Sequence, residues 1–235
     1  MSAAKPVAAS LPMLGVLGGG QLGRMFVHAA QTLGFRVAVL EPDANSPAGA
    51  AADLHLKAAY GDADALATLA RSCSAVTTEF ENVPAAALRA LARDVPVAPP
   101  ADAVMVCQHR AREKAAFAAA SVPCAPHAVI EREADLASPT LSQLLPGILK
   151  TASMGYDGKG QASVATLAEL ATAFAAFGGV ACVLEQRLPL QREISVIVAR
   201  GRDGTTVHLP VQQNLHRDGI LAVTQVPAPD RKSVV

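Results

Sequence analysis

Residues 13–25, MLGVLGGGQLGRM, decide the fold class of this chain. The apolar run Met13–Leu17 predicts a short buried strand, the glycines from Gly18 to Gly23 predict a tight turn, and apolar residues then recur at helical spacing. Gly34 ends this helix, and Arg36–Leu40 predicts a second buried strand. The segment is therefore a βαβ unit, in which a helix connects two parallel strands.

The alternation of short strands and helices continues over the first hundred residues. We expect a strand at Ala52–Leu56, a helix at Asp62–Arg71 and a strand at Ala75–Thr78. This alternation predicts a parallel sheet with helices on both faces. The run Pro96–Pro100 predicts a stiff connection at the edge of the domain.

A smaller α+β unit is expected beyond the proline-rich connection. Helical periodicity covers Ala103–Ala120, and Pro123 and Pro126 break it. The elements expected after this break are strands at Ile148–Lys150 and Val180–Glu185, a helix at 167–177, and a hairpin that joins Ile194–Ala199 to Thr206–Pro210.

The composition excludes several classes of protein. Hydrophobic residues make up 51% of the 235 residues, the formal net charge is zero, and no block of like charge occurs. We therefore expect no nucleic-acid or membrane partner. The four cysteines lack Cys-x-x-Cys spacing, which favours free thiols in a reducing cytoplasm. The apolar run near the N-terminus is too short for a signal peptide or a membrane span.

The first glycine turn allows three interpretations. Gly18, Gly20 and Gly23 have the spacing of a dinucleotide fingerprint, and Glu41 stands about 20 residues further on, as in NAD(P)-dependent oxidoreductases. Backbone N–H groups at a helix N-terminus also bind the single phosphate of a ribonucleotide. The glycines could instead serve only the close packing of strand and helix.

A second glycine-rich segment has the chemistry of a triphosphate site. GYDGKGQ at 155–161 follows Lys150, which stands at the end of an apolar stretch. Glycines allow backbone N–H groups to surround phosphate oxygens, and Lys150 and Lys159 add positive charge. The alternative for this segment is a tight surface turn.

Three motifs in order resemble the 5-(carboxyamino)imidazole ribonucleotide synthase family of ATP-grasp enzymes. They are GGGQLGRM at 18–25, TEFENV at 78–83 and GYDGKGQ at 155–161, and the resemblance covers residues 12–228. It implies an α/β ATP-grasp fold with a Rossmann-like N-terminal parallel-sheet domain. The implied domains are a tail at 1–11, a substrate-binding domain at 12–103, an α+β lid region at 104–187, and an incomplete C-terminal ATP-grasp domain at 188–235.

The resemblance also implies a reaction, that of an ATP-dependent carbon–nitrogen ligase of purine biosynthesis. ATP phosphorylates bicarbonate, and the carboxyphosphate formed releases carbon dioxide. The exocyclic amine of aminoimidazole ribonucleotide then captures the carbon dioxide. ATP and Mg²⁺ are the implied cofactors, and the family is commonly a homodimer.

Family positions match residues of this chain one by one. The resemblance implies ATP binding by Arg110, Lys150, Gly155, Tyr156, Asp157, Gly158, Lys159, Gly160, Gln161, Glu185, Gln186, Arg187, Leu188, Glu193 and His216. It implies binding of the ribonucleotide by Gly20, Gln21, Leu22 and Glu79, and catalytic roles for Lys150, Tyr156 and Asp157. Within the ATP set, Glu185 to Leu188 would face adenine and Glu193 the ribose.

Simpler roles remain open for some of these residues. Asp157 could cap N–H groups of its own loop, and His216 could be a solvated loop histidine. Glu81, two residues after the substrate position Glu79, could pair on the other face of its segment.

The C-terminal end departs from the family pattern. Residues 210–235 contain neither the paired metal carboxylates nor the basic patch of ATP-grasp enzymes, and DRKSVV at 230–235 no longer resembles the family. We therefore expect a truncated form of low activity, with the Mg²⁺ ligands in the missing part. A non-catalytic nucleotide-binding fragment is the alternative.

Overall fold

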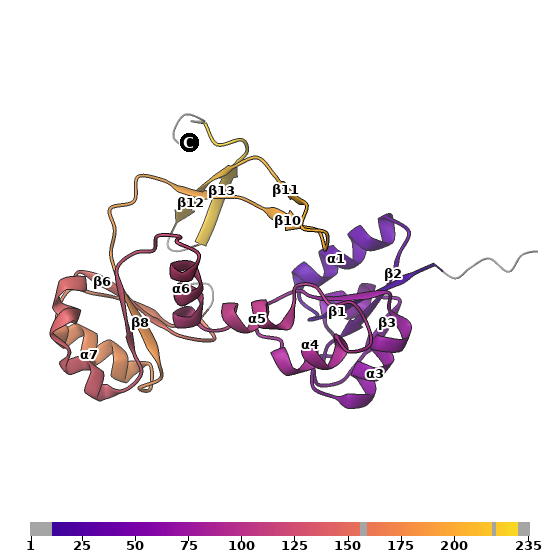
Figure 1. Ribbon diagram of the computed structural model, residues 1–235, viewed down its shortest axis with the longest axis horizontal. Helices are drawn as coiled ribbons and strands as arrows, with labels where there is room; N and C mark the ends of the chain where they lie inside the picture. The colour runs from indigo at the N-terminus through magenta and orange to yellow at the C-terminus, as the bar shows by residue number, and fades with distance from the viewer. Residues whose placement is uncertain (1–10, 156–158, 218–219, 230–235) are drawn as a thin grey trace, which may run out of the picture. The chain divides into compact units, whose positions relative to one another are not determined.

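The computed structural model describes residues 11–155, 159–217 and 220–229, and the chain divides into two compact units, Met1–Ala120 and Ser121–Val235 (Figure 1). None of the helices in the described ranges has the length and apolar character needed to cross a membrane. The division falls later than the boundary expected after residue 103. Helix α5 (Ala101–Cys107) packs against α4 (Ala85–Leu91), and α6 (Arg110–Ala119) packs against α5, so both helices belong to the first unit.

The first unit is built on a parallel sheet, which confirms the predicted fold class. Its strands are β1 (Met13–Leu17), β2 (Arg36–Leu40), β3 (Leu54–Leu56) and β4 (Ala75–Thr78). Their order is β3-β2-β1-β4, and all neighbours are parallel. The strand order reverses between β1 and β4, where parallel α/β sheets form a crevice at their carboxyl ends.

Helices cover both faces of this sheet because alternate strand residues point to opposite sides. Val16 and Val39 join one apolar cluster with α1 (Gln21–Thr32) and α2 (Pro47–Ala51). Leu17 and Leu40 join the other cluster, with α3 (Ala63–Ser72) and α4. These strands are therefore buried on both sides, as their continuous apolar sequence predicts.

Four details of the first unit differ from the sequence predictions. Helices α2 and α4 were not expected, and β3 begins at Leu54 because Ala52 caps α2. The helix expected over Ala103–Ala120 is two helices, since His109 is extended between them. Alanine-rich periodicity does not reveal this break, which coincides with tertiary hydrogen bonds of Gln108.

The second unit begins with an antiparallel sheet of order β5-β8-β6-β7. Its strands are β5 (His127–Ile130), β6 (Gly147–Thr151), β7 (Gln161–Val164) and β8 (Cys182–Gln186), and its helices are α7 (Leu167–Ala176) and the 3₁₀ helices η1 (Glu133–Ala137) and η2 (Pro139–Leu144). Figure 1 shows α7 beside β6 and β8. Leu149 and Leu184 pack with Leu170 and Phe174 of α7 in one buried cluster.

The last part of the second unit contains two small antiparallel sheets. Strands β9 (Glu193–Ser195), β12 (Gln212–Arg217) and β13 (Ile220–Gln225) form one sheet, and β10 (Val198–Arg200) and β11 (Thr206–His208) form the other. The expected hairpin is confirmed between β10 and β11, where Ala199 pairs with Val207. It is wrong for Ile194, which pairs with Gln213 of β12 instead.

Leu69 of α3 should be a main source of stability in the first unit. Its side chain is fully buried and lies against the sheet at Gly15, where a Cβ atom would meet its Cδ2 at 3.3 Å. We expect Leu69→Ala to lower the free energy of unfolding of this unit by about 2–5 kcal/mol, because it leaves a cavity. Urea denaturation followed by circular dichroism measures the change.

Leu33→Ala is the matched control for this substitution. Leu33 is 76% exposed, so we expect its truncation to change the unfolding free energy by less than about 0.5 kcal/mol. Equal losses in the two variants would contradict the assignment of Leu69 to the core.

Candidate functional site

The carboxyl ends of β1 and β4 bring Glu79 onto the first glycine turn. Its Oε1 accepts a hydrogen bond of 2.8 Å from Gly20 N–H, and its Oε2 accepts one of 2.7 Å from Gly23 N–H. These donors belong to the N-cap residue and the first turn of α1, where N–H groups lack helical partners and a negative charge is favoured. Both oxygens of the carboxylate are therefore held in a fixed orientation.

The Glu79 side chain explains why glycines occupy this turn. A Cβ atom on Gly18 would lie 2.3 Å from Glu79 Cγ, and one on Gly20 would lie 2.8 Å from Oε1. Gly18 also has a φ of +110°, which side chains rarely tolerate. A Cβ on Gly23 would instead approach the Gly18 carbonyl and Ala48, at 3.0 and 3.1 Å. Close packing thus accounts for Gly23, and the glutamate accounts for the other two glycines.

Two further N–H groups of the same helix end remain available. No group among the described residues accepts a hydrogen bond from the N–H of Gln21 or Leu22, and both residues are exposed. Helix N-termini of this kind bind anions. The turn can therefore hold the Glu79 carboxylate and still offer two backbone donors to a phosphate.

Glu41, the ribose-binding carboxylate of the dinucleotide interpretation, has other partners. Tyr60 donates its hydroxyl proton to Oε2 at 2.5 Å, and Asp43 N–H donates to Oε1 at 3.0 Å. Burial, and after it the hydrogen bond to Glu41, raises the pKa of Tyr60, so the phenol stays protonated and donates. Each Glu41 oxygen therefore already accepts one hydrogen bond within the protein.

A cavity of about 300 Å³ adjoins Glu79 at this edge of the sheet. Its lining residues are Thr78, Glu79, Phe80, Glu81, Pro99, Ala103, Val104 and Cys107. The Glu81 carboxylate accepts a hydrogen bond of 3.1 Å from the side chain of its neighbour Asn82. Glu79 is therefore the carboxylate held at the turn, and Glu81 makes a separate local contact.

The second candidate site is centred on an ion pair between adjacent strands. Lys150 Nζ of β6 lies 2.8 Å from Glu185 Oε2 of β8, and the two side chains are 21% and 15% exposed. Ile148 pairs with Glu185 in the register, so Lys150 and Glu185 are diagonal neighbours on one face. Their neighbours Leu149 and Leu184 point to the opposite, α7-covered face. An ammonium group has three donors, so Lys150 can bind Glu185 and a phosphate together.

The glycine-rich loop begins directly beside this ion pair. Lys150 pairs with Gln161 across the hairpin, and Thr151 N–H donates to the Gly160 carbonyl at 2.8 Å. Gly160 has a φ of +69°, and a Cβ there would lie 2.5 Å from Thr151 Oγ1. Gly155 and Lys159 flank the part of the loop outside the described residues, which contains Tyr156, Asp157 and Gly158.

The segment after Glu185 leaves one backbone donor available. Gln186 N–H donates to the Pro126 carbonyl at 2.9 Å, and Arg187 N–H donates to the Pro146 carbonyl at 3.0 Å. Within the described ranges, the N–H of Leu188 meets no acceptor. This is the type of backbone donor that an adenine edge can use.

The structure brings Glu193 and His216 together. Glu193 of β9 pairs with Asn214 of β12, and His216 Nδ1 lies 3.0 Å from Glu193 Oε2. His216 lies in a strand and not in a loop, and it is exposed beside this carboxylate. Arg110, the other cation expected at ATP, is the first residue of α6 and belongs to the first unit.

Two residues beside the sites were not expected from the sequence. Tyr60 holds Glu41, and Gln108 binds carbonyls of the segment that follows Glu79. No local pattern identifies either residue, since each acts on a segment distant in sequence. The described residues contain no group of three or more His, Cys, Asp or Glu side chains that could hold a metal ion.

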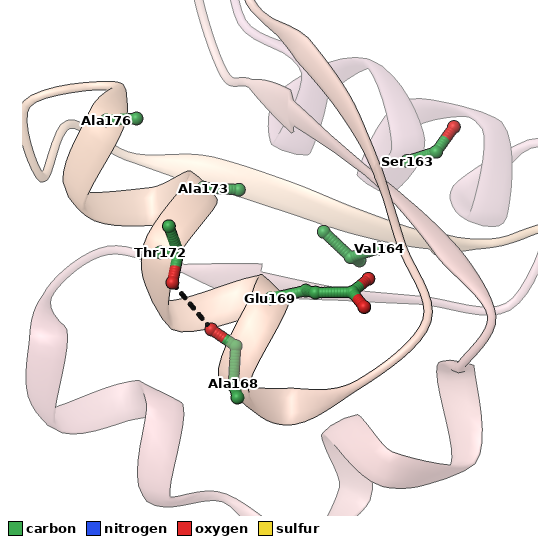
Figure 2. A pocket seen from close by; sticks show the side chains of 7 residues that line it. All are labelled: Ser163, Val164, Ala168, Glu169, Thr172, Ala173 and Ala176. Atoms are coloured by element: carbon green, nitrogen blue, oxygen red, sulfur yellow. Dashed lines mark hydrogen bonds between the residues drawn. The ribbon is translucent and has the colours of Figure 1, made fainter.

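A groove of about 480 Å³ between β7 and α7 is separate from both sites (Figure 2). Its lining residues are Ser163, Val164, Ala168, Glu169, Thr172, Ala173 and Ala176. Glu169 is engaged there, since its Oε2 accepts a hydrogen bond of 2.7 Å from Ala165 N–H. None of the residues expected to bind nucleotide or substrate lines this groove.

Comparisons with known proteins identify the two halves of the chain. The model of the ribonucleotide synthetase preATP-grasp domain matches residues 11–108, and the model of the ATP-grasp domain matches residues 115–234. The N5-carboxyaminoimidazole ribonucleotide synthase of Brucella melitensis is 41% identical over 217 residues, 92% of this chain and 60% of that protein. The Pseudomonas aeruginosa protein of the same name is 40% identical over 213 residues, 90% of this chain and 58% of that protein.

Solved structures of similarly named proteins share the fold. The ADP complex of the Staphylococcus aureus N5-carboxyaminoimidazole synthetase has a TM-score of 0.88 at 33% identity, over 94% of this chain and 60% of that one. The Aspergillus clavatus synthase with ADP and 5-aminoimidazole ribonucleotide has a TM-score of 0.81 at 30% identity, over 93% and 57%. The chain thus spans about three fifths of the relatives that it matches.

Gly18→Ala tests the fit between the glycine turn and Glu79. The added methyl would overlap Glu79 Cγ and impose a positive φ on alanine, so we expect a loss of about 1–3 kcal/mol in unfolding free energy. Gly61→Ala is the matched control, because no atom lies within 4 Å of a Cβ there. Urea denaturation measures both, and equal effects would contradict the packing described for Gly18.

Proposed function

The chain belongs to the ATP-grasp family, and we propose that it binds ATP and 5-aminoimidazole ribonucleotide for carboxylation of that ribonucleotide with bicarbonate. The products would be 5-carboxyaminoimidazole ribonucleotide, ADP and phosphate, in purine biosynthesis. The Brucella melitensis and Pseudomonas aeruginosa relatives, of which this chain covers 60% and 58%, have this synthase name.

The placement of Glu79 is the observation that carries the proposal. Its carboxylate takes two N–H donors of the glycine turn and leaves those of Gln21 and Leu22. Two donors suit one phosphate group of a ribonucleotide, and a fixed carboxylate suits the exocyclic amine of the same molecule as hydrogen-bond acceptor. Each Glu79 oxygen accepts one hydrogen bond from the turn and keeps a lone pair for this amine.

The second unit supplies groups suited to ATP. Lys150 would bind a phosphate oxygen while Glu185 holds its ammonium group in place. Leu188 N–H would donate to the adenine edge, and Glu193, supported by His216, would accept hydrogen bonds from the ribose hydroxyls. In the proposal, Arg110 binds phosphate as well.

The loop 155–161 would act as a lid over the phosphates. Carboxyphosphate decomposes in water, so a closed site protects it until the amine captures carbon dioxide. Tyr156 and Asp157 would face bicarbonate or the imidazole, and both lie outside the described residues.

Magnesium and a second subunit are further parts of the proposal. In ATP-dependent phosphoryl transfer, Mg²⁺ held by carboxylates would supply positive charge that neutralises the phosphates. The described residues do not fit this ion, because no suitable acidic cluster lies among them. The proposed assembly is a homodimer in the cytoplasm.

Replacement of Lys150 tests the ATP site. We expect Lys150→Met to weaken ATP binding about 10- to 100-fold. This loss corresponds to about 1.4–2.8 kcal/mol, the contribution of a hydrogen bond to a charged group. Isothermal titration calorimetry with ATP, and with NAD as a comparison ligand, measures the affinities. Lys57→Met changes the same charge at an exposed position of the first unit and should leave ATP affinity unchanged. Tight NAD binding with no ATP binding would contradict the proposal.

Replacement of Glu79 tests the substrate site. Glu79→Gln puts an amide where two N–H groups need acceptors, so one donor would face another donor. We expect the affinity for aminoimidazole ribonucleotide to fall about 10- to 100-fold in calorimetry. Glu131→Gln makes the same charge change at an exposed position of the second unit, and its affinity should equal that of the parent chain. Equal affinity in the Glu79 variant would exclude its role.

A further inference from the structure

Gln108 joins the end of α5 to the segment that follows Glu79. Its side-chain amide donates one hydrogen bond of 2.7 Å to the Glu81 carbonyl and one of 2.6 Å to the Val83 carbonyl. A primary amide has two donor hydrogens, so this pair of carbonyls uses both. The Gln108 backbone is itself fixed, because its N–H donates to the Val104 carbonyl at 3.0 Å as the C-cap of α5.

The segment 79–83 depends on such side chains because it lies beyond the strand ladder. Thr78 Oγ1 donates to the Phe80 carbonyl at 2.8 Å, and Gln108 satisfies the carbonyls of Glu81 and Val83. At its start, Glu79 N–H donates to the Leu17 carbonyl at 3.0 Å. Without the Gln108 side chain, the carbonyls of Glu81 and Val83 would lose this hydrogen-bond donor.

The geometry points to Gln108 as a positioning residue for Glu79. By anchoring the 79–83 segment to the α5–α6 junction, its amide keeps the Glu79 carboxylate on Gly20 and Gly23. Its consequence for substrate binding rests on the proposed function, in which Glu79 contacts the ribonucleotide. Arg110, proposed to bind ATP phosphate, follows two residues later at the start of α6. One side chain thus connects the substrate carboxylate with the helix that carries an ATP-binding arginine.

Amide hydrogen exchange in the full chain tests this inference without any ligand. Gly20 and Gly23 are more than 80 residues from Gln108 and are bonded to Glu79, so their exchange rates report on the carboxylate. We expect Gln108→Met, which keeps the length and removes both donors, to raise these two rates about 10-fold, the equivalent of one hydrogen bond. The amide of Val39 in the buried strand β2 should change less than about 2-fold, because the core is untouched.

Gln31→Met is a demanding control because Gln31 lies on α1 itself. Its side-chain amide donates to the Ala51 carbonyl at 3.1 Å and to Asp53 Oδ2 at 3.2 Å, so the variant also loses two amide hydrogen bonds. We expect the exchange of Gly20 and Gly23 to stay at the parent rate in this variant. The inference is overturned if both variants raise these rates equally, or if Gln108→Met raises them only in step with Val39.

Two further measurements complete the test. If Gln108→Met does not fold, Gln108→Asn takes its place in the test. It keeps the amide but is one methylene shorter. We expect it to raise the Gly20 and Gly23 exchange rates above those of the parent chain, but by less than the 10-fold expected for Gln108→Met. Calorimetry with aminoimidazole ribonucleotide should show about 10-fold weaker binding in the folded Gln108 variant and parent affinity in Gln31→Met. Absence of binding in the parent chain would refute the proposed substrate, whereas the exchange rates would still decide the role of Gln108.

Discussion

The hydrogen bonds from the first turn of α1 to the Glu79 carboxylate are the constraint on which the first unit depends. They connect the carboxyl ends of β1 and β4, the two strands between which the strand order reverses. They also explain Gly18 and Gly20, since a side chain at either position would overlap the glutamate. A negative charge at a helix N-terminus is electrostatically favoured, so backbone donors hold a charged group here.

The same contacts divide the donors of the helix end into two pairs. Gly20 and Gly23 hold the protein carboxylate, and Gln21 and Leu22 remain for an external anion. A site of this kind can hold a phosphate and an amine-bearing group side by side, because acceptor and donors are both fixed in one turn. The glycine motif therefore resembles a dinucleotide fingerprint in its backbone geometry. The ligand that the turn can bind depends on the side chain that lies against it, which here is that of Glu79.

In the second unit, the register of two antiparallel strands brings the residues of the candidate site together. Lys150 and Glu185 meet because their strands are neighbours and their positions are diagonal on one face. Their apolar neighbours face α7, so the core holds the strands that carry the ion pair. The hairpin that contains the glycine-rich segment starts at Lys150 itself, so this cation stands at the base of the segment.

The sequence by itself determined the parallel sheet, the helices α1 and α3, the strands β6 and β8 and the ATP-grasp family. These features depend on local periodicity and on motifs of adjacent residues, which are readable one segment at a time. Tertiary structure alone decided the break at His109, the pairing of Ile194 with β12 and the contacts of Glu79, Tyr60 and Gln108. Each of these involves hydrogen bonds between segments distant in the chain. Their partners become defined only when packing has brought the segments together, because a donor in the sequence does not specify its acceptor.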